Sequence, residues 1–78
     1  MSCQAVSAAR DYRIVLGETI RAERVRAGTT IERLAEKAGL HPNYLGRVER
    51  GEESASVAAL LRIAKALKVR VRELFAGV

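Results

Sequence analysis

Residues 41–50 carry the side chains of this chain that are best suited to recognising a partner. Arg47 is the strongest candidate, because its planar fork of donors matches O6 and N7 of guanine. Asn43 can pair with N6 and N7 of adenine, and Pro42 can contact a thymine methyl. The candidate DNA-contacting residues are His41, Pro42, Asn43, Tyr44, Gly46, Arg47 and Arg50.

Other side chains of this segment suit the backbone of a duplex rather than its bases. The first residues of a recognition helix reach base edges and the later ones reach the groove walls, which places Arg50 toward phosphates. His41, at the start of the helix, also faces phosphates. Tyr44 has two interpretations, a wedge between helices or a hydroxyl on a phosphate, and packing is favoured. The alternative for Arg47 is an ordinary solvated arginine.

The residue types needed for catalysis and metal binding are sparse. His41 is the only histidine and Cys3 the only cysteine, so no catalytic triad, Cys/His nucleophile pair or zinc site is available. The glycines occur singly at expected helix ends, which excludes a glycine-rich phosphate loop. We therefore expect no catalytic residue, no metal site, no cofactor and no small-molecule ligand, and we do not predict an enzyme.

Two short helices joined by a tight turn position these side chains. Apolar residues recur at helical spacing over residues 31–38, and Gly39 can end that helix with a positive φ. Pro42 suits the first turn of a second helix, which stops at Gly51. Ala35 is small enough for the helices to cross closely. The apolar faces are Ile31, Leu34, Ala35 and Ala38 in the first helix, and Leu45 and Val48 in the second. This is the geometry of a helix-turn-helix, whose second helix can lie in a DNA major groove.

A longer helix, expected over residues 12–26, carries a charge on its apolar side. Its stripe is Leu16, Ile20, Arg24 and Ala27. Glu49 similarly follows the buried position Leu45 by four residues. Because a buried charge needs a partner, we predict that Arg24 and Glu49 pair across the core. The alternative is two solvated side chains.

Two further helices complete the predicted all-α fold. Thr29 or Thr30 caps the helix over residues 31–38, and Ser56 caps a helix over residues 57–68. The core side of that later helix is Val57, Leu60, Leu61, Ala64 and Leu67, and a short last helix carries Val71, Leu74 and Phe75. Together these elements predict a compact domain of five helices.

The chain length and charge fit one small domain, over residues 11–78, with residues 1–10 as a flexible lead-in or a short arm that contacts a partner or DNA. The net charge of +5 favours a polyanionic partner such as double-stranded DNA, although an ordinary basic protein is the alternative. Cys3 cannot form an internal disulfide, and no apolar run approaches the length of a membrane span. We therefore expect a cytoplasmic protein with no membrane partner.

An excess of apolar residues near the C-terminal end predicts a second copy of the chain as a partner. Exposed apolar patches commonly mark interfaces, and two-fold dimers are the commonest oligomers. The expected dimer residues are Leu61, Val69, Val71, Phe75 and Val78. The alternative is that these residues complete the core of the monomer.

Three segments, LGETIRAERVRAGTT, LAEKAGLHPNYLGRVERG and LLRIAKALKVRVRELF, resemble the Xre-type, lambda-repressor-like helix-turn-helix family. The resemblance covers Leu16 to Phe75, and it implies a lambda-repressor-like fold and DNA binding. It also places the internal ion pair of the family at Arg24 and Glu49.

Within that family, the segment GLHPNYLGRVERGEESAS is most similar to the controller proteins of restriction–modification systems. Those are small dimers that bind palindromic operators. The resemblance implies that the C-terminal helices form the dimer and that the residues facing DNA are Asn43, Gly46, Arg47 and Arg50.

This chain departs from the family pattern at two places. The family often has a glutamine that contacts a phosphate where this chain has Ile31, which cannot make that contact. Controller-like loops usually carry Arg-Asn where this chain has Glu53 and Ser54, so the loss of a cation should weaken contacts with the DNA backbone.

The sequence as a whole predicts a homodimeric, sequence-specific transcriptional regulator that binds an inverted-repeat operator, of the controller kind. A phage-type repressor and the antitoxin of a toxin–antitoxin pair are alternatives within the same class. A protein-binding adaptor with the same fold is the alternative from another class.

Overall fold

The computed structural model describes residues 11–78 and folds them into helices alone. The elements are α2 (Tyr12–Arg26), α3 (Ile31–Ala38), α4 (Pro42–Glu49), α5 (Val57–Leu67) and α6 (Val71–Leu74). The predicted five-helix, all-α fold is thus confirmed. The lead-in or arm predicted for residues 1–10 lies outside the described residues. Among the helices of residues 11–78, none has the length and apolar character needed to cross a membrane.

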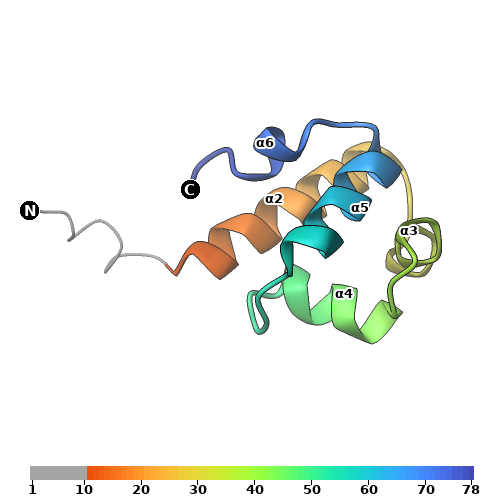
Figure 1. The fold of residues 1–78 in the computed structure, drawn as a ribbon, viewed down its shortest axis with the longest axis horizontal. Helices are drawn as coiled ribbons and strands as arrows, with labels where there is room; N and C mark the ends of the chain where they lie inside the picture. The colour runs from red at the N-terminus through yellow and green to blue at the C-terminus, as the bar shows by residue number, and fades with distance from the viewer. Residues whose placement is uncertain (1–10) are drawn as a thin grey trace, which may run out of the picture.

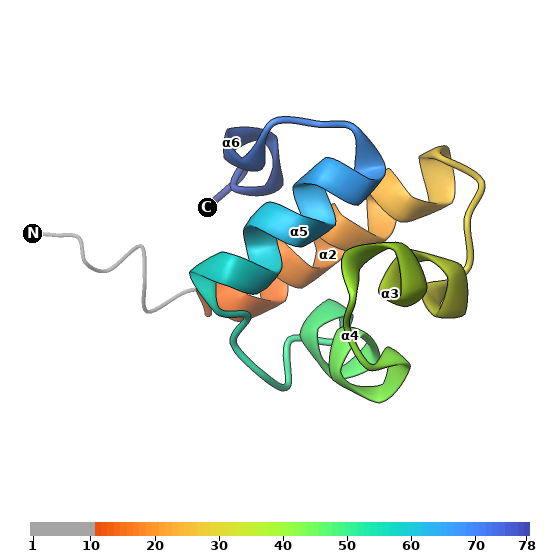
Figure 2. The same ribbon diagram turned by 45° about the vertical axis from the view of Figure 1, so that its right-hand side comes forward.

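The helices enclose one hydrophobic core. Helix α3 packs against α4 and α5, α2 packs against α4, and α6 closes over α2 and α5. Figures 1 and 2 show α4 and α6 on opposite sides of the body that α2 and α5 form. The buried residues of the core are Leu16, Ile20, Leu34, Ala35, Ala38, Leu45, Val48, Leu60, Ile63, Ala64, Leu67 and Leu74.

Local side-chain caps fix where the helices begin and end. Thr30, rather than the threonine before it, caps α3, because its Oγ1 accepts a hydrogen bond from the backbone N–H of Arg33 at 3.1 Å. Ser56 caps α5 in the same way, with Oγ 3.0 Å from the backbone nitrogen of Ala59. Gly39 ends α3 at φ 70°, in the left-handed region predicted for it.

Three residues predicted on the buried side of a helix are exposed instead. Ala27 is the C-cap of α2, beyond the last helical residue, so the helical period no longer places it. On α5, Val57 is 73% exposed and Leu61 is 53% exposed. The true buried seam of α5 includes Ile63, which the predicted stripe omitted, and this rotates the buried face away from Val57 and Leu61.

Gly17 of α2 lies directly against the backbone at the end of α4. A Cβ atom at this position would lie 2.3 Å from the carbonyl oxygen of Val48 and 2.6 Å from that of Glu49. Both are backbone atoms at the C-terminal end of α4, so neither can move aside without moving the helix. The absence of a side chain at Gly17 therefore sets the distance between these two helices.

Gly17→Ala should lower the free energy of unfolding by about 1–3 kcal/mol, the usual cost of overpacking, although alanine is the better helix former. Gly46→Ala is the matched control, because a Cβ there meets only the movable end of Arg50, at 3.2 Å from Nη1. We expect Gly46→Ala to leave stability unchanged or raise it by up to about 1 kcal/mol. Urea denaturation followed by circular dichroism measures both. Equal stability of the two variants would contradict the assigned role of Gly17.

Candidate nucleic-acid interface

The first turn of α4 is built by a proline and a side-chain cap. Pro42 occupies the first turn, where its fixed φ suits a helix and its missing N–H is not needed. Nδ1 of His41 accepts a hydrogen bond from the backbone N–H of Asn43 at 3.1 Å. His41 is exposed, as expected for a phosphate-facing residue, but one of its two ring nitrogens is already used in this cap.

The other end of α4 is closed by Gly51, which lies in the left-handed region at φ 77°. The backbone N–H of Glu52 donates to the carbonyl of Arg47 at 2.9 Å, and that of Gly51 donates to the carbonyl of Val48 at 3.1 Å. This pair of bonds is a Schellman motif. The motif turns the chain sharply, so that residues 52 and 53 return alongside the helix.

The buried side of α4 is held by the predicted ion pair, which the structure confirms. Nε of Arg24 donates to Oε2 of Glu49 at 2.7 Å, and Nη2 donates to Oε1 at 3.1 Å. Nη1 of Arg24 also donates to the carbonyl of Thr29 at 3.0 Å. The side chain of Arg24 is 14% exposed and that of Glu49 is 4% exposed. Hydrogen bonding to Glu49 raises the pKa of Arg24, so the guanidinium remains charged in the core at neutral pH.

The opposite side of α4 presents polar and basic groups to solvent. Asn43, Arg47 and Arg50 are exposed, and Pro42 is half-buried beside them. Gly46 is buried, although it was predicted to face DNA, because the Arg50 side chain lies over it. A shallow hollow runs between this face and the start of α3, lined by residues that include Ile31, Asn43, Arg47 and Arg50.

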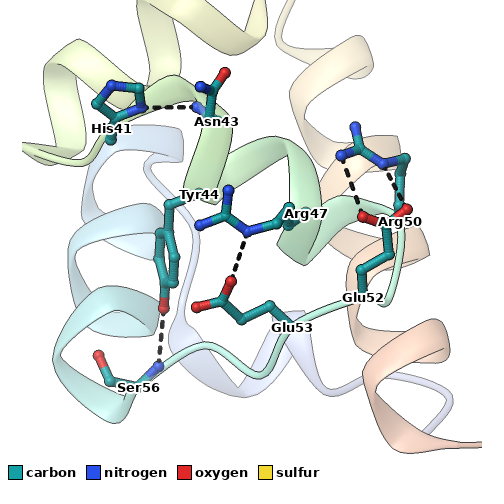
Figure 3. Close-up of polar contacts among 8 residues, drawn as sticks. All are labelled: His41, Asn43, Tyr44, Arg47, Arg50, Glu52, Glu53 and Ser56. Carbon is teal, nitrogen blue, oxygen red and sulfur yellow. Dashed lines mark hydrogen bonds and ion pairs between the residues drawn. The ribbon is translucent and has the colours of Figure 1, made fainter.

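Two glutamates just after α4 pair with its arginines, and the sequence analysis did not predict these contacts. Nε of Arg47 donates to Oε1 of Glu53 at 2.7 Å (Figure 3). Arg50 donates to Glu52 through Nε at 2.9 Å and through Nη2 at 3.3 Å. Hydrogen bonding to Arg50 lowers the pKa of Glu52. Gly51 is the sequence feature from which these contacts could have been predicted, because the turn that it permits brings the following residues back beside the helix.

Tyr44 packs between elements rather than extending into solvent. It is half-buried, and its hydroxyl accepts a hydrogen bond from the backbone N–H of Ser56 at 3.2 Å (Figure 3). The ring therefore ties α4 to the start of α5. This geometry supports the packing interpretation, and the hydroxyl oxygen already serves the loop that precedes α5.

A family model for helix-turn-helix domains, HTH_3, matches residues 20–74, which include α3, α4 and the turn between them. The chain belongs to this helix-turn-helix family. Helix α4 is accordingly the second helix of its helix-turn-helix, and the predicted Xre-type family is confirmed.

Relatives and solved structures agree with this assignment. The control protein C.SmaI of Serratia marcescens is 39% identical over 64 residues, which are 82% of this chain and 76% of that protein. The crystal structure of the restriction–modification controller protein C.AhdI of Aeromonas hydrophila superposes with a TM-score of 0.78 at 37% identity, covering 80% of this chain and 94% of that one.

The clp gene regulator ClgR of Corynebacterium glutamicum superposes with a TM-score of 0.82 at 31% identity, covering 86% of this chain and 87% of that one. Several other helix-turn-helix regulators that match are longer, and the chain spans 30–42% of their length. Transcriptional regulators are thus the class to which this helix-turn-helix chain is similar.

The residues predicted for a dimer divide into two groups. Leu61, Phe75 and Val78 are exposed, at 53%, 39% and 61%. Val69 and Val71 are half-buried and pack against the core cluster. Leu61 lies on α5, whereas Phe75 and Val78 lie at and beyond the end of α6, which Figure 1 shows on the opposite side of the body from α4.

Glu49→Ala should destabilise the helix-turn-helix by about 3–5 kcal/mol, because it leaves the Arg24 guanidinium partly buried without its carboxylate. Arg26→Ala is the control, since it breaks the Arg26–Glu23 pair at 3.2 Å, whose arginine is 74% exposed, and should cost less than about 1 kcal/mol. Thermal denaturation of both variants measures the difference. A Glu49→Ala protein as stable as Arg26→Ala would show that the buried pair contributes nothing.

Proposed function

We propose that the chain is a sequence-specific DNA-binding regulator that acts as a homodimer on an inverted-repeat operator, of the kind represented by restriction–modification controllers. The observation that carries the proposal is the outer face of α4. It projects the exposed Asn43, Arg47 and Arg50 from a helix whose two ends and buried side are all fixed. A helix held in this way can enter a major groove without rearranging the rest of the domain.

Arg47 has the geometry of the base reader within this face. Its side chain is 44% exposed, and within residues 11–78 only its Nε is engaged, by Glu53. Bidentate recognition of guanine needs two adjacent N–H donors, and Nη1 and Nη2 provide them. Asn43, in the first turn, is placed for adenine. Arg50, at the C-cap, lies where a recognition helix approaches a groove wall and its phosphates.

The homodimer is supported by the exposed apolar residues at the C-terminal end. Phe75 and Val78 expose apolar surface at and beyond the end of α6, on the opposite side of the body from α4, and Leu61 adds an exposed apolar side chain on α5. A second copy can bind at the α6 end while both recognition helices remain accessible. In such a dimer the two helices enter successive major grooves roughly 34 Å apart, and the operator is an inverted repeat with half-sites about one helical turn apart. The controller assignment is supported by the likeness to C.SmaI and C.AhdI.

Selection of binding sites from random duplexes identifies the operator, and Arg47→Ala then tests the reader. We expect this change to cost about 1–3 kcal/mol on the operator and to relax the preference at one base pair in each half-site. Arg72→Ala on α6 removes the same charge on the side away from α4, and it should leave that preference intact. Unchanged base preference in Arg47→Ala would rule out the reader role.

Phe75→Glu should convert the dimer to a monomer, because it places a charge in the apolar surface at the C-terminal end. Val25→Glu is the matched control, since Val25 is 60% exposed on α2 and lies outside the proposed interface. Sedimentation velocity measures the mass of each variant. A Phe75→Glu protein that remains dimeric would place the interface elsewhere, and a monomeric wild type would refute the homodimer.

A further inference from the structure

The two glutamates that follow the recognition helix touch its arginines in different ways. From this difference we propose that Glu53 is a positioning residue that orients Arg47 for base recognition, whereas Glu52 competes with phosphates for Arg50 and limits affinity for any DNA. The inference rests on the proposed function, because it assumes that Arg47 reads a base. It adds two specificity and affinity determinants that lie outside the helix-turn-helix.

Glu53 holds Arg47 by the inner edge of its guanidinium. The bond joins Nε to Oε1 at 2.7 Å, and within residues 11–78 the structure records no partner for the two terminal nitrogens. Figure 3 shows Glu53 meeting the guanidinium at Nε. The outer edge of the fork is thus left open for guanine, and the carboxylate fixes its orientation without occupying the donors that would read the base.

Glu52 occupies Arg50 differently. Its two carboxylate oxygens accept from Nε and Nη2, so one full edge of the Arg50 guanidinium is engaged. Both side chains are more than half exposed, at 58% and 54%. A phosphate that approaches Arg50 must displace this carboxylate or tolerate its negative charge nearby. That cost is the same for every sequence, because all duplexes share the same backbone.

The loop presents both carboxylates from a fixed backbone. Besides the Schellman motif, Gly51 packs so closely on Ile14 that a Cβ would lie 2.8 Å from its Cγ1. The hydroxyls of Tyr12 and Ser54 are 3.0 Å apart, and the hydroxyl of Tyr44 accepts from the backbone of Ser56. Residue 53 therefore lies between Gly51 on one side and Ser54 and Ser56 on the other, all of which are held by these contacts. This arrangement restricts the rotamers of Arg47 before DNA arrives, which is how a positioning residue improves discrimination.

The test compares Kd for the selected operator with Kd for a duplex changed at the base pair that Arg47→Ala relaxes. Exposed ion pairs are individually weak, so Glu53→Ala should reduce this discrimination ratio by about two- to fivefold. Glu53→Gln keeps an oxygen that can accept from Nε, so it should retain the ratio while raising affinity for both duplexes. Glu52→Ala should raise affinity for both duplexes by a similar factor and leave the ratio unchanged.

The double variant Arg47→Ala/Glu53→Ala separates positioning from general electrostatics. If Glu53 acts through Arg47, the ratio of the double variant should equal that of Arg47→Ala alone. Suppose that Arg47→Ala abolishes discrimination between the two duplexes but Glu53→Ala retains it in full. That result would overturn the inference and leave the proposed function standing. If Arg47→Ala relaxes the preference at no base pair, the inference and the reader role of Arg47 are both overturned. A changed discrimination ratio in Glu52→Ala would contradict the proposal that Glu52 limits affinity while Glu53 controls specificity.

All five variants alter exposed or half-exposed side chains, so circular dichroism and thermal denaturation should show the wild-type fold. The wild-type chain is used throughout as the reference, at one fixed salt concentration.

Discussion

The bidentate ion pair between Arg24 and Glu49 joins the segments that must stay in register if α4 is to present its outer face. The guanidinium bonds the carboxylate with two nitrogens and the carbonyl of Thr29 with the third, so α2, the turn before α3 and the end of α4 meet at one group. Removing such charges from water is expensive, and only nearly complete hydrogen bonding makes their burial tolerable. The pair thus holds these three segments in one arrangement.

Close packing makes that arrangement stiff. Next to the ion pair, Gly17 lets the backbone of α2 approach the carbonyl oxygens at the end of α4. An ion pair alone could tolerate a small shift of the helix, because both side chains are long. A backbone contact cannot. The two features together restrict the position of α4 along its axis and its distance from α2. The outer, basic face of α4 is therefore held in a defined position.

Most of the fold could be predicted from the sequence, because it follows from local patterns. Apolar spacing, Gly39 and Pro42 define the helix-turn-helix, and two charges on apolar faces predict the ion pair. The pattern failed at helix ends, where the helical period does not apply, because Ala27 and Val57 are exposed. It also failed within α5, where omitting Ile63 from the stripe put the exposed Leu61 on the predicted buried face. It also missed Gly17, because a contact with backbone oxygens leaves no complementary residue type to recognise.

The candidate site was predicted less completely, for a related reason. The outward arginines follow from their register on α4, but their partners depend on the path of the loop after Gly51. From the sequence, Glu53 could be interpreted only as the loss of a cation that would favour contact with the DNA backbone. The structure shows that the same carboxylate contacts Arg47, so its effect depends on direction as well as on sign of charge.

The Schellman turn at Gly51 has a consequence for how such a protein can change over generations. The path of residues 51–56 is set by backbone bonds and by the hydroxyl groups of Tyr12, Tyr44, Ser54 and Ser56, so it uses no side chain of residue 52 or 53. Mutation can therefore exchange acidic, neutral and basic side chains at those two places while the scaffold stays intact. A lineage can retune the strength and selectivity of its regulator there through single codon changes, without first acquiring a compensating change in the core.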